Sequence, residues 1–212
     1  MFDGTSGDWA TEPVDLELNP DSRPFNSRYY PVPRINKEIF RNNLKCLVEI
    51  GVLTPVQQSH YGTPIFMIPK KEETVRFITD YHRINQELVR NTYSLPIIGE
   101  TIQQLEGFQY TTELYLNMGY YAIKLSPATQ DMTTIVTEFG KFRYNRLRMG
   151  MCASRDIFRA KVDDLLGDTE DVKNYIDDIF VLGKDSFENH TDQLRIIFVI
   201  LRAAVLKVSA PK

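Results

Sequence analysis

Two adjacent carboxylates, Asp177 and Asp178, are the residues of this chain best placed by their type and spacing to do chemistry. They stand between two short apolar runs, 172–176 and 179–182, whose composition favours β-strands. Aspartate is common in turns, so the pattern predicts a hairpin with acid at its tip. Rigidly held carboxylate oxygens can bind two magnesium ions for phosphoryl transfer. An ordinary Asp-Asp turn is the alternative, and the flanking sequence has to decide between them.

The motif is the last of six sequence blocks that follow one another in a fixed order, and these blocks decide between the two interpretations. They are Tyr29-Tyr30-Pro31-Val32-Pro33-Arg34, Gly51-Val52-Leu53 with Tyr-Gly-Thr-Pro-Ile-Phe-Met-Ile-Pro-Lys-Lys at 61–71, Val-Arg-Phe-Ile-Thr-Asp-Tyr-His-Arg-Ile-Asn at 75–85, Leu-Asn-Met-Gly-Tyr-Tyr at 116–121, Leu-Arg-Met-Gly-Met-Cys at 147–152 and Tyr-Ile-Asp-Asp at 175–178. With these blocks, residues 29–212 resemble the reverse transcriptase of gypsy-type long-terminal-repeat retrotransposons. Each motif alone is moderately specific, whereas six in order leave little room for chance.

The resemblance implies an α+β fold with the fingers and palm subdomains of a right-hand polymerase. Residues 1–28 are then an acidic extended lead-in, and 29–212 are the reverse transcriptase domain. The fingers comprise about 29–90 and 124–150, and the palm about 91–123 and 151–212. Because the chain stops at Lys212, where the family continues, the thumb is expected to be absent.

Periodicity and turn residues predict the elements that would position the motifs. Helices are expected at 36–50, around 98–105, at 154–166 and at 188–206. Strands are expected at 64–68, 74–80 and 110–116, and hairpins at 132–138 with 141–147 and at 172–176 with 179–182. This order suits a palm with inserted fingers.

The resemblance also assigns roles. Asp177 and Asp178 become catalytic ligands of Mg2+, and the partners become an RNA/DNA template-primer and deoxynucleoside triphosphates. The incoming triphosphate would be bound by Arg76, helped by Lys70 or Lys71, since Arg and Lys suit phosphates. A solvated strand edge is the alternative for these three residues.

Tyr120 matches the aromatic gate of the family, whose ring packs against the sugar of the incoming nucleotide. A core aromatic is the alternative for this residue, and Tyr121 fits that alternative better. We expect Asp80 to be structural rather than catalytic.

Tyr115 breaks the resemblance at the metal site, because the family has a metal-binding aspartate there, two residues before Asn117. A phenol has a pKa near 10, so it is neutral at pH 7 and a poor ligand for a hard divalent ion. Glu113 projects from the same strand face, but its Cα lies roughly 6.5 Å away, which is too far for substitution. A weak or partial Mg2+ site is expected.

Further departures surround the site. Arg148, Arg155 and Arg159 replace residues of other types, so segment 141–161 holds seven basic residues and one acid. This could be a reinforced phosphate-binding patch or sequence drift, and we favour drift. Val205 replaces a glycine expected after the last helix, where φ is often positive, so strain or helix extension is expected.

Composition is that of a globular protein, with no apolar run long enough to span a bilayer and no signal-like start. The formal charge of −3 hides an asymmetry. Residues 1–22 carry six acids and no Lys or Arg, whereas the rest carries 25 basic and 22 acidic residues. The two cysteines lie in separate blocks without metal-like spacing, which indicates free thiols. We expect an intracellular protein, in cytoplasm or nucleus.

Three hypotheses follow. The favoured one is a retrotransposon reverse transcriptase fragment by descent that is polymerase-inactive because Tyr115 replaces a metal-binding Asp. The second is a nucleic-acid-binding or interaction module without catalysis. The third is an active RNA-directed DNA polymerase, which would require an intact carboxylate triad.

Overall fold

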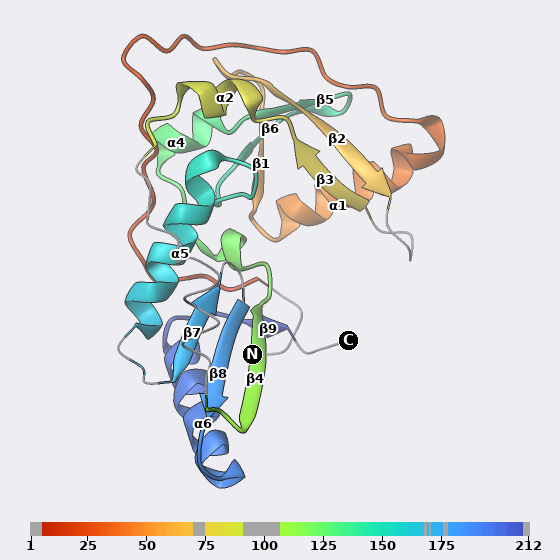
Figure 1. The fold of residues 1–212 in the computed structure, drawn as a ribbon. Coiled ribbons are helices and arrows are strands. Elements are labelled where there is room, and N and C mark those ends of the chain that lie inside the picture. Colours follow the sequence, from red (N-terminus) through yellow and green to blue (C-terminus); the bar gives the residue numbers. More distant parts are fainter. Residues whose placement is uncertain are drawn as a thin grey trace. The chain divides into compact units, whose positions relative to one another are not determined.

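The chain divides into two compact units (Figure 1). This computed structural model describes residues 6–69, 75–90, 107–167, 169, 171–175 and 178–209. Unit 1 comprises 1–10, 91–122 and 155–212, and unit 2 comprises 11–90 and 123–154. The predicted fingers ranges fall within unit 2, and most of the predicted palm falls within unit 1.

Unit 2 is built on a five-stranded sheet in the order β1-β6-β5-β2-β3. Its strands are β1 (Leu53–Val56), β2 (Thr63–Pro69), β3 (Val75–Thr79), β5 (Ile135–Thr137) and β6 (Gly140–Tyr144). Its helical elements are η1 (Arg34–Asn36), α1 (Lys37–Glu49), α2 (His82–Glu87) and α4 (Pro127–Met132). All neighbouring strands are antiparallel except β2 and β5, which pair in parallel. Phe40 of α1 packs edge-on against Phe77 of β3, with ring centroids 4.8 Å apart, and so fixes the helix to the sheet.

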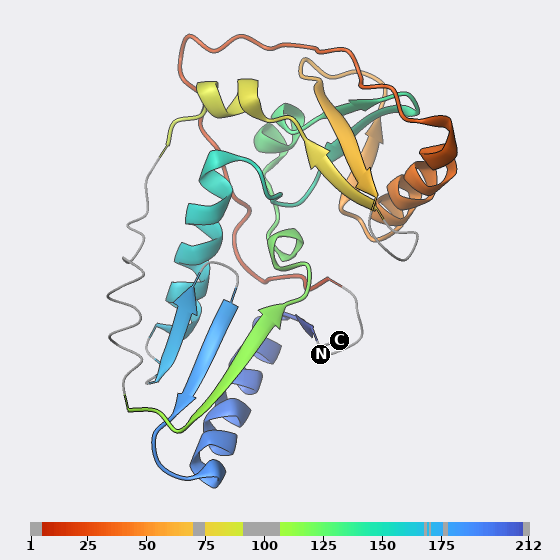
Figure 2. The same cartoon turned by 45° about the vertical axis from the view of Figure 1, so that its right-hand side comes forward.

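Unit 1 is built on a four-stranded sheet in the order β7-β8-β4-β9. Its strands are β4 (Tyr110–Leu116), β7 (Val172–Tyr175), β8 (Asp178–Gly183) and β9 (Val208–Ser209), and η2 (Gly119–Ala122) follows β4. Helix α6 (Phe187–Ala203) lies against one face of this sheet (Figure 2). Helix α5 (Cys152–Leu166) contributes its residues from Arg155 onward to the same unit.

Short polar contacts and positive φ angles set the helix ends. Ser186 caps α6 by accepting a hydrogen bond from the backbone N–H of Asn189 at 3.2 Å. Helix α1 ends before Gly51, whose φ of 72° glycine adopts without strain. Helix α6 ends before Val205, which also has a positive φ, 57°. Of the two expected outcomes, strain and helix extension, strain is therefore found, because a β-branched residue rarely adopts such an angle.

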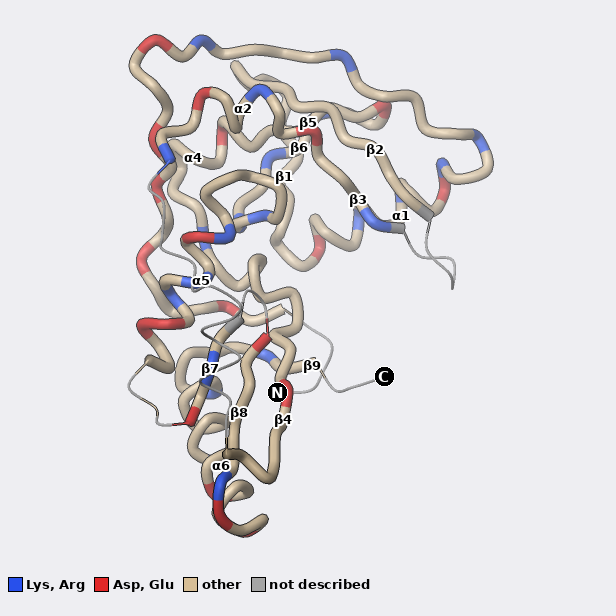
Figure 3. Tube along the Cα trace, in the orientation of Figure 1, with Lys and Arg blue, Asp and Glu red and all other residues tan. Residues whose placement is uncertain are grey.

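The N-terminal strap, residues 6–33, forms isolated bridges but no helix or regular strand. It is nevertheless packed: Trp9 is buried in unit 1, and Leu16 and Phe25 are buried in unit 2. The backbone N–H of Trp9 donates to the carbonyl of Ala122 at 2.9 Å. Acidic residues recur along the strap (Figure 3). These contacts make the strap part of both cores.

The predicted strand 110–116 is found with its predicted ends, and the other predicted strands and hairpins are found with shifted ends. The predicted helices at 36–50, 154–166 and 188–206 are also found with shifted ends. The helix predicted around 98–105 lies outside the described residues. Two helices, α2 and α4, were not predicted, because each has only six residues and shows no full helical period. Among the described residues, no helix is long and apolar enough to cross a membrane. Both cysteines are free thiols.

Candidate active site

Tyr115 and Asp178 are direct partners in the antiparallel pair of β4 with β8. Residues directly opposite in such a pair point to the same face of the sheet, with Cα atoms about 4.5–5.5 Å apart. Asp178 is also paired with Tyr175 of β7, and Tyr115 with Ser209 of β9, so the four residues form one row across the sheet. The predicted proximity of Tyr115 to Asp178 is confirmed. Asp177 lies outside the described residues.

The opposite face of this sheet belongs to the core of unit 1. Leu114 and Ile179, which are also direct partners, are buried there. Thr112 lies on the same face, and its Oγ1 is 2.9 Å from Nε2 of the buried His190 on α6. Because side chains alternate along a strand, this packing leaves the Tyr115 side chain on the outer face, where it is 46% exposed.

Tyr115 contacts a second carboxylate, that of Glu113, on the same strand and the same face. A side-chain hydrogen bond to Glu113 is the largest cause that raises the pKa of the Tyr115 phenol above its usual value. Burial and the negative charges of Glu113 and Asp178 raise this pKa further. The phenol is therefore protonated at neutral pH and is a hydrogen-bond donor to Glu113 rather than a negatively charged ligand.

The described donor set does not fit a magnesium ion. Magnesium prefers charged oxygen ligands at near-octahedral positions, and a protonated phenol supplies no such ligand. Across the described ranges, no three His, Cys, Asp or Glu side chains are grouped so that they could hold a metal. The Glu113 carboxylate accepts a hydrogen bond from this phenol, which raises the pKa of Tyr115.

Tyr120 is buried, with 8% exposure, and stacks on Phe158 of α5 with ring centroids 4.5 Å apart and planes at 20°. Gly119 permits this contact, because a Cβ at that position would lie 3.0 Å from the Phe158 ring. The ring of Tyr120 thus has the core packing that was the alternative to a nucleotide gate, whereas Tyr121 is only half-buried. A role for Tyr120 at a nucleotide stays a prediction.

Arg76 is exposed on β3, opposite Ile68 of β2. Phe66 lies two residues earlier on β2 and so shares the face of Ile68; the two are 40% and 47% exposed. An exposed guanidinium beside exposed apolar side chains suits contact with nucleotides. Lys70 and Lys71 lie outside the described residues.

Arg148 is not part of a basic surface, because it is 7% exposed. Its guanidinium donates to the backbone carbonyl of Phe77 and lies 4.9 Å from the ring centroid of Tyr144. Its own carbonyl accepts a hydrogen bond from Ser154 Oγ at 2.6 Å. Arg148 therefore joins β3, β6 and the start of α5 within unit 2.

Arg159 is also buried, at 7% exposure, and its Nε donates to the Asp163 carboxylate one turn later at 3.1 Å. The second oxygen of Asp163 accepts a hydrogen bond from Asn174 of β7 at 3.2 Å. Two of the seven basic residues in segment 141–161 are thus internal. A phosphate-binding surface there is smaller than the residue count suggests.

Asp80 has the structural environment predicted for it. Tyr30 donates its hydroxyl to one carboxylate oxygen at 2.9 Å, and His82 contacts the other through its backbone N–H and Nδ1 at 3.3 and 3.2 Å. Burial raises the pKa of Asp80, but the hydrogen bonds from Tyr30 and His82 outweigh it, and the pKa is lowered. The Tyr30 contact, 50 residues away in sequence, could not be predicted from spacing.

Comparisons with known proteins find one family model and several relatives. Residues 68–212 match the family model described as "Reverse transcriptase (RNA-dependent DNA polymerase)". The Pol polyprotein of the transposon opus from Drosophila melanogaster is 30% identical over 209 residues, which cover 94% of this chain and 20% of that protein. The Pol polyprotein of the transposon gypsy, from the same species, is 26% identical over 91% of this chain and 19% of that protein. The chain thus spans about a fifth of these relatives.

Solved structures show the same fold. A prototype foamy virus protease-reverse transcriptase has a TM-score of 0.88 and 28% identity, covering 98% of this chain and 28% of that chain. A foamy viral protease-reverse transcriptase in complex with double-stranded DNA has a TM-score of 0.82 and 25% identity, covering 98% of this chain and 36% of that chain. The predicted α+β polymerase fold and the predicted resemblance are both confirmed.

Proposed function

This chain belongs to the reverse transcriptase (RNA-dependent DNA polymerase) family, and we propose that it is a retrotransposon reverse transcriptase domain that no longer polymerises DNA. One observation carries the proposal: Tyr115, opposite Asp178, presents a protonated phenol where the resembled family presents a metal-binding carboxylate. The lineage is that of the retrotransposon Pol polyproteins matched above.

The chemical argument concerns the anchoring of metal ions. In phosphoryl transfer, positioning and neutralisation of charge supply nearly all of the acceleration. Two ions must be held in place relative to the primer hydroxyl, and carboxylates on separate strands of a rigid sheet can do this. With Tyr115 neutral and bonded to Glu113, β4 does not supply at this position the carboxylate that the resembled family uses to hold an ion. The expected result is weak metal binding without synthesis.

A second candidate function, nucleic-acid binding without catalysis, has support of its own. A related foamy viral protease-reverse transcriptase was solved in complex with double-stranded DNA. In this chain Arg76 is exposed beside Phe66 and Ile68, which suits contact with a template-primer or a nucleotide. Both candidates predict binding, and both predict that primer extension fails.

Primer extension on an RNA template, with magnesium and all four deoxynucleotides, tests the proposal. The unmodified chain should extend no primer, whereas binding of the same template-primer should be measurable by fluorescence anisotropy. Binding should weaken steeply as salt increases, because Lys and Arg contacts to phosphates release counterions.

Two outcomes would contradict the proposal. Extension by the unmodified chain that disappears in Asp177→Asn would mean that another group completes the metal site. An anisotropy signal that does not depend on salt would contradict an electrostatic nucleic-acid surface.

A further inference from the structure

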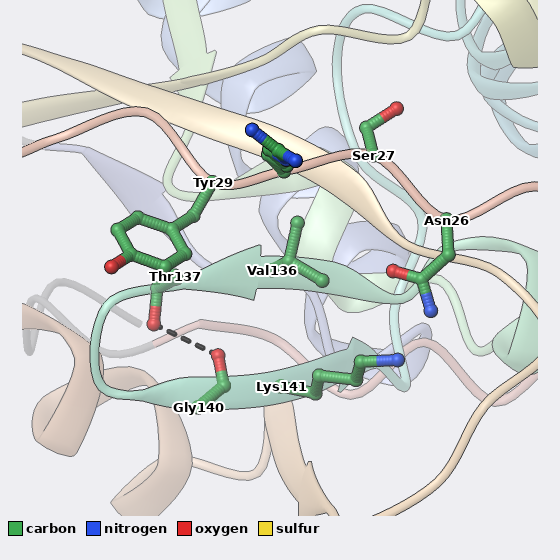
Figure 4. Close-up of a pocket in the computed structure, with 8 residues that line it drawn as sticks. Asn26, Ser27, Tyr29, Val136, Thr137, Gly140 and Lys141 are labelled. Carbon is green, nitrogen blue, oxygen red and sulfur yellow. Dashed lines mark hydrogen bonds between the residues drawn. The ribbon is translucent and has the colours of Figure 1, made fainter.

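A surface groove in unit 2, here called the strap groove, runs between the N-terminal strap and the β5–β6 hairpin (Figure 4). Its volume is about 620 Å³, and it is lined by Asn26, Ser27, Arg28, Tyr29, Val136, Thr137, Gly140 and Lys141. Figure 4 shows the Tyr29 ring towards the hairpin turn, Asn26 towards the other end, and Val136 pointing from β5 into the space between. From the sequence, only Lys141 of these residues lay in a segment considered for phosphate binding, and no role was assigned to the other seven.

The walls and floor of the groove have different chemistry. Val136 and Thr137 are buried and form a rigid floor, because Thr137 Oγ1 donates to the Gly140 carbonyl at 2.9 Å and closes the hairpin. The Tyr29 side chain is 52% exposed, so one face of an aromatic ring is available to a ligand. Arg28 at the strap is exposed as well.

The charge of the groove is positive. Its lining contains Arg28 and Lys141 and no acidic residue, and within the described residues neither cation forms an ion pair. The nearest acid in sequence, Glu138 at the hairpin tip, is neutralised by Lys37 with an Nζ–Oε2 distance of 2.6 Å. The groove is therefore suited to an anionic ligand.

The position of the strap is fixed by backbone contacts rather than by the ligand. The N–H of Ser27 donates to the Gly62 carbonyl and the N–H of Gly62 donates to the Phe25 carbonyl, both at 2.8 Å. A Cβ on Gly62 would lie 2.2 Å from Asn26 Oδ1, so a larger residue would require the Asn26 side chain to move. The groove is preformed, which lowers the entropy cost of binding.

We propose that the strap groove binds single-stranded nucleic acid, with a base stacked on Tyr29 and successive phosphates at Arg28 and Lys141. An aromatic platform flanked by cations is the arrangement that binds single strands without sequence preference. Asn26 and Ser27 add donors for phosphate or base oxygens. This inference rests on the proposed nucleic-acid binding. It adds where on the chain the nucleic acid binds and that the bound form is single-stranded.

The first test compares a labelled oligo-deoxythymidylate with a blunt duplex by fluorescence anisotropy, on the full chain. The double substitution Arg28→Gln with Lys141→Gln should weaken single-strand binding about tenfold and reduce the salt slope by about 1.4, since each phosphate contact contributes about 0.7. Blunt-duplex binding should change less than about twofold, because the duplex does not enter the groove.

A matched control is the double substitution Arg23→Gln with Lys45→Gln, which removes the same charge from exposed residues of unit 2 outside the groove. It should leave single-strand binding nearly unchanged. If the two double variants weakened single-strand binding equally, the inference about the groove would be overturned, and the loss of net positive charge would explain the weakening. If the unmodified chain bound the duplex but not the single strand, the inference about the groove alone would be overturned. If it bound neither, the proposed nucleic-acid binding would be overturned as well.

A second test does not depend on how the variants fold. Oligonucleotides carrying 5-iododeoxyuridine crosslink under ultraviolet light to aromatic rings on which the base stacks. Mass spectrometry of the unmodified chain should place the crosslink on Tyr29. Crosslinks confined to residues outside the strap groove would contradict the inference.

Discussion

Tyr115 faces Asp178 across the β4–β8 pair, while its phenol is held by Glu113 two residues earlier on the same strand. The exposed face of the unit 1 sheet therefore carries a hydrogen-bonded Tyr-Glu pair beside an aspartate. Such a pair keeps the tyrosine protonated, because both neighbouring carboxylates disfavour the phenolate. The loss of metal anchoring that we propose rests on the chemistry of this one side chain.

The first prediction concerns the ionisation of Tyr115. Its pKa should lie above the ordinary value near 10, and Glu113→Gln should lower it, because the substitution removes a negative charge and a charged acceptor. The chain has 11 tyrosines, so nuclear magnetic resonance of Cζ-labelled tyrosine is the measurement, with Tyr115→Phe to assign the signal. A Tyr115 pKa that is unchanged by Glu113→Gln would contradict the hydrogen bond.

The second prediction concerns Val205. Its φ of 57° belongs to a hydrogen-bonded motif that ends the helix. The N–H of Val205 donates to the Arg202 carbonyl at 3.0 Å, and the N–H of Leu206 donates to the Leu201 carbonyl at 2.9 Å. Val205→Gly should raise the free energy of unfolding by about 1 kcal/mol, because glycine adopts this angle without strain.

Urea denaturation followed by fluorescence of Trp9, the sole tryptophan, measures this change close to the site, since the N–H of Asp8 donates to the Val205 carbonyl. Val205→Ala is the control and should stabilise less, because alanine keeps a Cβ at positive φ. A destabilised Val205→Gly variant would mean that the valine side chain contributes more than its strain costs.

The third prediction concerns Gly62, which the sequence marked only as part of a motif. Gly62→Ala should lower the free energy of unfolding of unit 2 by about 1–3 kcal/mol, because its Cβ would overlap Asn26. Asn26→Ala should rescue part of this loss, since the overlap is with a side chain. Hydrogen exchange at Ser27 is the measurement. Equal protection of Ser27 in the unmodified chain, in Gly62→Ala and in the double variant with Asn26→Ala would show that the strap is not held through Gly62.

The fourth prediction separates internal from surface arginines. Arg148→Met should lower the free energy of unfolding by about 1–3 kcal/mol, because the Phe77 carbonyl loses its donor. Nucleic-acid affinity and its salt slope should not change, since Arg148 is buried. Arg155→Met, at an exposed position of the same segment, is the comparison for affinity. A reduced salt slope in Arg148→Met would mean that Arg148 contacts nucleic acid after all.

Much of the fold could be predicted, because strand composition and helix ends are local properties. The strand 110–116 was predicted with both ends correct, since it is rich in residues that favour strands and Gly107 separates it from the preceding segment. The parallel pairing of β2 with β5 could not be predicted, because it joins segments about 70 residues apart. The same holds for the packing of Trp9 and Phe25, which composition alone placed in a lead-in.

For the candidate site, the sequence predicted which residues share a strand face but not what they contact. Tyr115 beside Asp178 follows from motif order, whereas the bond to Glu113 depends on side-chain rotamers. The burial of Arg148 and Arg159 was missed because charge is normally taken as a sign of exposure. The strap groove could not be predicted, since its two cations lie 113 positions apart in sequence.

The central claim is that Tyr115 removes a metal anchor, and isothermal titration calorimetry with Mg2+ or Mn2+ tests it most directly. Tyr115→Asp should bind the ion at least about tenfold more tightly than the unmodified chain, a difference of about 1.4 kcal/mol. Tyr115→Asn introduces a side chain of the same size as aspartate but without its charge, and it should show no such gain in affinity. The claim would be contradicted if the unmodified chain and Tyr115→Asp bound the ion with equal affinity and if Asp177→Asn abolished binding in both.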